Sequence, residues 1–341
     1  MTKTRVFALI AAITMLFSAL ACAGGGHLQT AEPSSSPTAL LMNSATPTVP
    51  VTQFVETAAP TPTPIPYEPI TSWPCISPGV YPKVDGSTAT IPLAEGLRML
   101  LTGCSREEAE ASIDFSTTDF SYHALAEGNA DFLLVYEPAD ATKSELDPFN
   151  KMTMIPIGLD ALVFIVNETN PVQSISIEDI QGIYTGRITN WKDLGGNDVP
   201  IVPFQRPDLS GSQTLMKRLC MKGIPMMEPS EDRISQDMAD IIEDVAMYDN
   251  THGGAIGYSV YYYAKNMYTQ PGVRFIAVEC SMPSDESINY MSYPLINPFY
   301  AVLPKNRFNS YAYAIVQWLR SESGQLFIKS CGYVPIMIFD D

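Results

Sequence analysis

Three short stretches rich in serine, threonine and glycine stand directly before segments with helical periodicity. They cover residues 86–90, 116–118 and 210–212. The first turn of a helix leaves backbone N–H groups without partners and carries partial positive charge, so hydroxyl groups placed there complete a set of donors for an anion. One such stretch is also what an ordinary capped helix needs. Three in one chain favour an anion-binding site.

Arg206 precedes the third stretch by four residues. Its guanidinium group can hold two oxygens of a tetrahedral anion through a planar fork of N–H donors, a geometry that lysine cannot supply. A surface ion pair beside an ordinary helix cap is the alternative interpretation. We expect Arg206 to bind the anion.

Other site chemistries have no support in the sequence. His27, His123 and His252 are far apart, and there is no HExxH motif, calcium-binding loop or Cys/His cluster, so we predict no metal site. Serine-hydrolase elbows, Walker A loops and GxGxxG loops are absent as well, so we predict no cofactor and no enzymatic activity.

The charge balance excludes one large class of partners. The 341 residues include 37 acidic residues and only 20 lysines and arginines, which gives a formal net charge of -17. A chain this acidic has no broad basic face with which to release phosphate counterions, so nucleic-acid binding is not expected.

Strand-like and helical patterns alternate from about residue 67 to the end of the chain. Residues 161–166 form a continuous apolar run, which is typical of a strand buried on both faces. Helices are predicted at 93–101, 120–127, 176–184, 211–221, 233–247 and 310–321, and further strands at 130–135, 200–204, 255–258 and 273–278. This alternation predicts an α/β fold with largely parallel sheets.

The first 66 residues differ from the rest. Residues 1–22 combine Lys3 and Arg5 with an apolar run of signal-peptide length, and they end in small residues before Cys22. This pattern resembles a bacterial lipoprotein signal in which Cys22 is lipidated, with ordinary secretion as the alternative. Residues 23–66, rich in serine, threonine and proline, are expected to form a disordered tether. The mature protein is then extracytoplasmic and anchored to the outer face of the bacterial cell membrane.

Longer motifs between residues 84 and 335 resemble the phosphate-binding solute receptors (PstS-like) of bacterial ABC transporters. The most specific part covers residues 161–172 (ALVFIVNETNPV), residues 183–191 (IYTGRITNW) and the segment from Arg206 to 210–212. Later matches are residues 254–258 (GAIGY), 293–295 (YPL) and 332–335 (GYVP).

The resemblance implies a two-lobed, periplasmic-binding-protein-like α/β fold (type II) with the ligand in a cleft between the lobes. One lobe would take residues 67–158 and 265–341, and the other residues 159–264. A non-enzymatic receptor would then deliver phosphate or a related oxyanion to an ABC permease in the membrane. The ligand-binding candidates that it implies are Ser87, Thr88, Thr90, Thr117, Thr118, Arg206, Ser210, Gly211 and Ser212.

One departure from the family concerns ligand identity. Phosphate receptors carry an aspartate that accepts the ligand's proton in the segment matching residues 135–138, and here Tyr136 takes that place. Glu137, one position later, is the candidate substitute. Alternatively, Tyr136 donates a hydrogen bond and changes the preference, so both residues are ligand-binding candidates.

Two other functions fit the same residues. An oxyanion sensor or scavenger would report to a signalling partner instead of a permease. A secreted enzyme acting on a phosphorylated substrate would need a general base beside the anion site, and Glu137 is the candidate for that role.

Overall fold

The computed structural model describes residues 76–337. The predicted signal segment with Cys22, and the predicted tether over 23–66, lie outside the described residues. Within 76–337 the structure contains no helix that is both long and apolar enough to span a bilayer.

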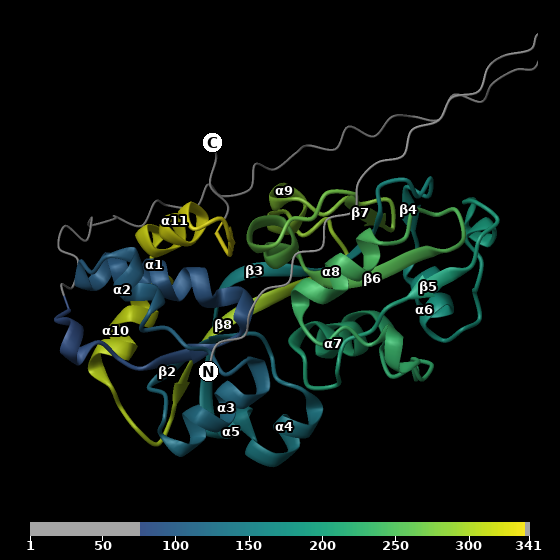
Figure 1. Ribbon diagram of the computed structural model, residues 1–341. Helices are drawn as coiled ribbons and strands as arrows, with labels where there is room; N and C mark the ends of the chain where they lie inside the picture. The colour runs from purple at the N-terminus through teal and green to yellow at the C-terminus, as the bar shows by residue number, and fades with distance from the viewer. Residues whose placement is uncertain (1–75, 338–341) are drawn as a thin grey trace, which may run out of the picture. The chain divides into compact units, whose positions relative to one another are not determined.

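A long strand, β3 (Met152–Asn167), joins the two parts of the sheet (Figure 1). Its first part, Met152 to Ala161, pairs antiparallel with β8 (Ile296–Pro304). Its last residues, from Leu162 onward, pair with β6 (Gly254–Val260). One strand therefore carries the chain from one set of hydrogen-bond partners to another.

The remaining strands extend the sheet on both sides of β3. They are β1 (Val84–Gly86), β2 (Phe132–Val135), β4 (Ser174–Ile175), β5 (Ile201–Pro203), β7 (Val273–Val278) and β9 (Val334–Pro335). The order β1-β2-β8-β3-β6-β5 forms the main path, while β7 and β9 also pair with β3.

The prediction of largely parallel sheets is wrong. Of the eight strand pairings in the described residues, three are parallel: β1 with β2, β4 with β7 and β5 with β6. The reason is that β6, β7, β8 and β9 all run back along β3. Strand β8 escaped prediction because its sequence contains Pro298 and ends in Pro304, and prolines disfavour a strand assignment.

Eleven α-helices lie within residues 76–337, besides shorter 3-10 and π-helical segments. They are α1 (Ile91–Thr102), α2 (Arg106–Glu110), α3 (Thr118–Glu127), α4 (Asp140–Leu146), α5 (Pro148–Lys151), α6 (Ile177–Tyr184), α7 (Gly211–Leu215), α8 (Met238–Ala246), α9 (Asp285–Asn289), α10 (Ser310–Leu319) and α11 (Glu322–Ser330). The helix predicted at 211–221 forms as α7 followed by a π-helical turn, Met216–Met221. Ser176 caps α6 as expected, because its side chain accepts a hydrogen bond from the backbone N–H of Asp179.

The largest hydrophobic cluster contains most of β3 from Ile157 to Val166. Residues 161–166 are all at most 1% exposed, which confirms the prediction of a strand buried on both faces. The same cluster contains Leu93 of α1, Leu215 of α7 and Tyr258 of β6. Helices from early and late in the chain are therefore fixed on one apolar framework.

The predicted lobe boundaries stay a prediction. The first, between residues 158 and 159, falls inside β3, and the second, between 264 and 265, falls in the turn Tyr263–Met267. Strand β7 follows the second boundary and pairs with the same part of β3 as β6.

Candidate anion-binding site

The three hydroxyl-rich stretches meet in space. The Ser87 and Thr118 hydroxyls are hydrogen-bonded at 2.8 Å, and the backbone N–H of Tyr136 donates to the Ser87 hydroxyl at 3.2 Å. Gly211 adjoins them, because a Cβ added there would lie 2.8 Å from the Thr118 hydroxyl oxygen. The loop before α1 and the first residues of α3 and α7 thus surround one point.

Asp85, which the sequence analysis missed, holds two of these stretches together. One carboxylate oxygen accepts the backbone N–H groups of Gly86 at 2.7 Å and of Ser116 at 2.8 Å. The other accepts the Ser116 hydroxyl at 2.5 Å. The only signal in the sequence is its place directly before the first stretch, and nothing local indicates the distant partner Ser116.

Thr117 has an unusual backbone at the start of α3. Its φ of 77° and ψ of 171° lie in a region that is essentially restricted to glycine and that costs other residues about 1–3 kcal/mol. Thr117 is exposed, and its side chain makes no capping hydrogen bond to the helix. Its hydroxyl therefore has no structural task at the cap and is available to a ligand.

The other predicted hydroxyl groups differ in the hydrogen bonds that they already make within the protein. Ser210 caps α7 by accepting from the backbone N–H of Gln213 at 3.2 Å, which leaves its own proton free to donate. Ser212 is 3% exposed beside it, and Thr88 is half-buried in the first loop. Thr90 is fully buried and donates to the carbonyls of Ser87 and Leu134, so it supports the loop and does not face an anion.

Arg206 is buried, with 8% of its surface exposed. Its Nη2 donates to the Gln236 carbonyl at 2.9 Å, while Nε and Nη1 are buried without a hydrogen-bond partner among the described residues. Burial lowers the pKa of the Arg206 guanidinium, since desolvation disfavours the charged form. A surface ion pair is excluded, because Arg206 makes no ion pair within residues 76–337.

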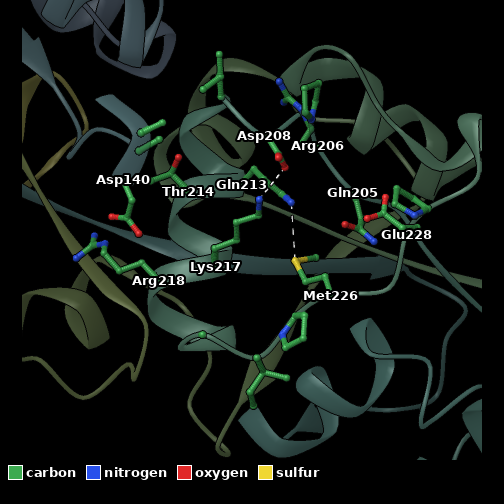
Figure 2. Close-up of a pocket in the computed structure, with 18 of the residues that line it drawn as sticks. Asp140, Gln205, Arg206, Asp208, Gln213, Thr214, Lys217, Arg218, Met226 and Glu228 are labelled. Carbon is green, nitrogen blue, oxygen red and sulfur yellow. Dashed lines mark hydrogen bonds and ion pairs between the residues drawn. The ribbon is translucent and has the colours of Figure 1, made fainter. Parts of the chain in front are cut away.

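Arg206 also lines a cavity of about 1000 Å³ (Figure 2). Lys143 from α4 and Thr214, Lys217 and Arg218 from the helix after Ser210 contribute to its wall. Among the predicted ligand-binding residues, only Arg206 lies on this wall. The cavity was missed because its residues come from distant segments, and their spacing is that of an ordinary helix surface.

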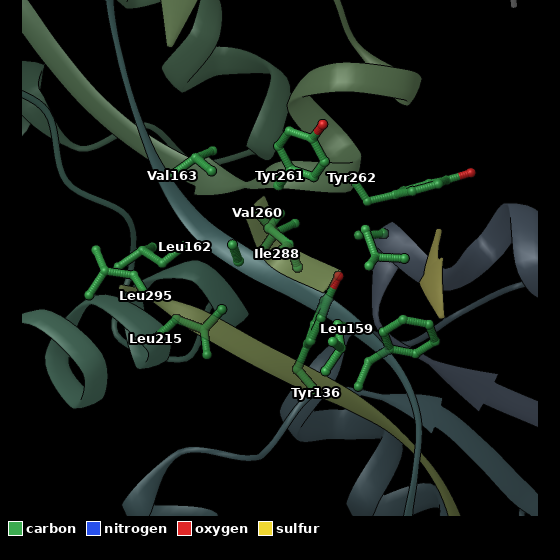
Figure 3. Packing of buried hydrophobic residues seen from close by; sticks show 14 of the residues in the cluster. Tyr136, Leu159, Leu162, Val163, Leu215, Val260, Tyr261, Tyr262, Ile288 and Leu295 are labelled. Carbon is green, nitrogen blue, oxygen red and sulfur yellow. The ribbon is translucent and has the colours of Figure 1, made fainter. Parts of the chain in front are cut away.

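Tyr136 does not present an acidic group to the anion. Its hydroxyl donates to Asp160 Oδ2 at 2.5 Å, and its ring lies 6.4 Å from the Phe299 ring, within the buried apolar cluster that Figure 3 shows. Burial raises the pKa of the Tyr136 hydroxyl well above its usual range, and the neighbouring Asp160 adds to that shift.

Glu137 is engaged by two cations. Lys143 Nζ lies 2.7 Å from one carboxylate oxygen, and Arg218 Nη1 lies 3.1 Å from the other. Both oxygens are thus used in ion pairs that link α4 to the helix after Ser210. The role of Glu137 as the acceptor of the ligand's proton stays a prediction.

Asp160 is a second residue that the sequence analysis missed. It lies in β3 near the point where pairing changes from β8 to β6, and it is 1% exposed. Its Oδ1 accepts the backbone N–H groups of Ala161 at 2.7 Å and Tyr262 at 3.0 Å. Desolvation raises the pKa of Asp160 to about 6, although these hydrogen bonds oppose the shift. A lone acid directly before an apolar run was the available signal.

Replacing Gly211 with alanine is expected to weaken anion binding about tenfold, with little change in the midpoint of thermal unfolding. The new Cβ would stand 2.8 Å from the Thr118 hydroxyl, so the first residues of α3 and α7 must move apart at this point. Titration calorimetry measures the loss, and Gly79→Ala, whose Cβ would meet nothing within 4 Å, is the control. Equal affinities for both variants would contradict the close approach.

Comparison with known proteins places the fold in a family. Residues 79–323 match the PBP superfamily domain. The phosphate-binding protein PstS of Borreliella burgdorferi is 24% identical over 260 residues, which cover 74% of this chain and 89% of that protein. PstS of Bacillus subtilis is 28% identical over 181 residues, covering 53% and 56%.

A solved structure agrees with that match. The ABC-type phosphate transport receptor from Vibrio cholerae superposes with a TM-score of 0.54 at 24% identity, covering 74% of this chain and 98% of that one. The predicted periplasmic-binding-protein-like α/β fold of type II is confirmed. From its sequence match and its architecture, this chain belongs to the PBP superfamily.

Proposed function

We propose that this chain is an extracytoplasmic receptor that captures inorganic phosphate, or a closely related tetrahedral oxyanion, for uptake through an ABC transporter. The observation that carries the proposal is Arg206, a buried cation with two donor nitrogens that no described residue uses. Burying charged donors without partners costs desolvation free energy. A ligand that accepts both hydrogen bonds offsets this cost, which favours binding.

The surrounding residues supply further donors to such an anion. The Ser87 and Thr118 hydroxyls are hydrogen-bonded to each other beside Gly211, and Ser210 directly precedes Gly211 in the chain. Thr117, next to Thr118, adds a hydroxyl that makes no capping hydrogen bond. They come from segments on different parts of the sheet, so an anion between them would favour the arrangement in which these segments are close. That preference is the property a transport receptor needs.

The relatives support phosphate as the ligand. Two curated relatives are named phosphate-binding proteins, and the Vibrio cholerae structure is an ABC-type phosphate transport receptor. We extend the phosphate ligand and the permease partner from those proteins to this chain.

An exported, lipid-anchored form completes the proposal. Cys22 would be lipidated after removal of residues 1–21, and residues 23–66 would hold the folded part away from the membrane. Mass spectrometry of the mature N-terminus tests this step, and an unmodified N-terminus elsewhere in the chain would contradict it.

A receptor is better supported than an enzyme. The enzymatic alternative depended on Glu137 as a general base, and that carboxylate is paired with Lys143 and Arg218. Each of its two oxygens lies in an ion pair, so a general base here would have to give up one of these contacts.

Titration calorimetry of the ligand-stripped protein with phosphate, followed by sulfate, tests the proposal. We expect one phosphate per chain with a favourable enthalpy, since charge-assisted hydrogen bonds dominate the site. If neither phosphate nor sulfate gives a heat of binding, the protein is not an oxyanion receptor. Heat with sulfate alone would keep the oxyanion site and exclude phosphate as its ligand.

A further inference from the structure

The cavity beside Arg206 contains unused donors from three residues, spread along its wall. Besides Arg206 Nε and Nη1, the Thr214 hydroxyl and Arg218 Nε are buried without a hydrogen-bond partner among residues 76–337. All three residues line the same cavity, and Thr214 is only 7% exposed. Buried polar atoms are paired in the great majority of cases, so this concentration indicates a ligand.

These donors form a row. Thr214 in α7 and Arg218 in the π-helical turn that follows it are four residues apart, and in the view of Figure 2 Thr214 lies between Arg206 and Arg218. At the rise of an α-helix, the distance from Ser210 to Arg218 is about 12 Å. A single tetrahedral anion held by Arg206 and Ser210 leaves the far end of this row without a partner.

Arg218 is fixed in place at that end. Its Nη1 pairs with Glu137 at 3.1 Å, and its Nη2 donates to the Asn297 side chain at 2.5 Å. The guanidinium is therefore held by two groups while Nε stays free. A positioned donor of this kind is suited to hold an acidic group without ordering a flexible side chain.

The lining charge and volume agree with an organic anion. Five cations face the cavity against three carboxylates, in a chain whose net charge is -17. Leu209, Ile224, Pro225 and Met226 add an apolar wall. Cavities of roughly 300–1,000 Å³ hold organic ligands, and this one is about 1000 Å³.

We propose that the cavity accepts the organic part of a phosphate monoester that carries a second acidic group. The phosphoryl group would lie on Arg206, the carbon skeleton along Thr214 and the apolar wall, and the second acid at Arg218. This inference rests on the proposed oxyanion site and names a wider substrate class for it.

The test compares three probes by titration calorimetry: inorganic phosphate, glycerol 3-phosphate and 3-phosphoglycerate. We expect 3-phosphoglycerate to bind at least tenfold more tightly than glycerol 3-phosphate, because only the former has a carboxylate for Arg218. Arg218→Lys keeps the positive charge and the pairing with Glu137 but removes the Nε donor. It should remove that tenfold preference and leave phosphate affinity unchanged within twofold.

Thr214→Val is the second variant. It tests the same cavity even if Arg218→Lys folds poorly. The Thr214 hydroxyl has no partner in the described structure, so a methyl group in its place should not lower the unfolding midpoint. We expect a several-fold loss for both esters and none for phosphate. Arg187→Lys, on an exposed arginine outside the cavity, is the matched control.

The outcomes separate the two proposals. Phosphate binding without binding of either ester would overturn this inference and leave the oxyanion receptor standing. Ester binding that neither variant changes would also overturn it. Failure of all three probes would reject the oxyanion site itself.

Discussion

Replacing Arg206 with alanine is expected to abolish most phosphate binding. Removing one partner of a buried charge pair costs about 2–5 kcal/mol, which corresponds to roughly a 30- to 5,000-fold weaker affinity. The effect should be at the upper end, because Arg206 is 8% exposed and water cannot replace its donors. Titration calorimetry with phosphate measures the loss.

Folding should survive that substitution. Two of the three side-chain nitrogens of Arg206 have no partner within the described residues, and the remaining one makes a single hydrogen bond to Gln236. Truncation removes a desolvated charge along with one hydrogen bond, and these effects oppose each other. We expect the midpoint of thermal unfolding to change by a few degrees at most.

Two further variants help to interpret the loss of binding in Arg206→Ala. Arg206→Lys keeps a cation but loses the planar fork, so its affinity should lie between those of the wild type and the alanine variant. Arg187→Ala removes an exposed arginine paired with Glu178 and should leave binding unchanged. Wild-type affinity in Arg206→Ala would reject the site assignment.

The sequence was sufficient to locate the three hydroxyl-rich stretches that meet in the structure. Ser87, Thr118, Ser210 and Gly211 could be found because hydroxyl-rich caps and helix starts are local features, which depend on neighbours in the sequence. Arg206 was found for the same reason, by its spacing from a predicted cap. The apolar run at 161–166 also has a local signature.

The long-range partners could not be predicted. Glu137 was expected at the anion, but its environment depends on Lys143 and on Arg218, which is 81 positions away in the chain. The sheet was expected to be largely parallel, because an alternation of strands and helices does not reveal that four strands return along β3. Non-local pairing of this kind has no signal in the spacing of residues.

Asp160 is expected to make the protein less stable as the pH rises from about 4 to about 6. The pKa of this carboxyl is about 6 in the folded protein, against an ordinary value of 3.8. Between these values the folded protein holds a proton that the unfolded chain has released, so raising the pH favours unfolding. A difference of two pKa units corresponds to about 3 kcal/mol, and the contribution is constant above the folded pKa.

The variant Asp160→Asn isolates this contribution. An asparagine oxygen can still accept from the backbone N–H groups of Ala161 and Tyr262, and its amide can donate to the Tyr136 hydroxyl oxygen, so the shape of the site is kept. Urea unfolding at pH 4.5, 5.5, 6.5 and 7.5 gives the free energy of unfolding of both proteins. Relative to the wild type, the variant should gain about 2 kcal/mol between pH 4.5 and pH 7.5, because the rest of the effect lies below pH 4.5.

The matched control is Asp198→Asn, which removes an exposed carboxylate beside Lys192. Hydrogen bonding to Lys192 lowers the pKa of Asp198, so its contribution is present at neutral pH and is lost as the pH falls. The two variants should therefore differ from the wild type with opposite pH trends, the surface one being small. Parallel curves for Asp160→Asn and the wild type would mean that Asp160 stays ionised in the folded protein. Its three hydrogen bonds would then outweigh burial at the junction of β8, β3 and β6.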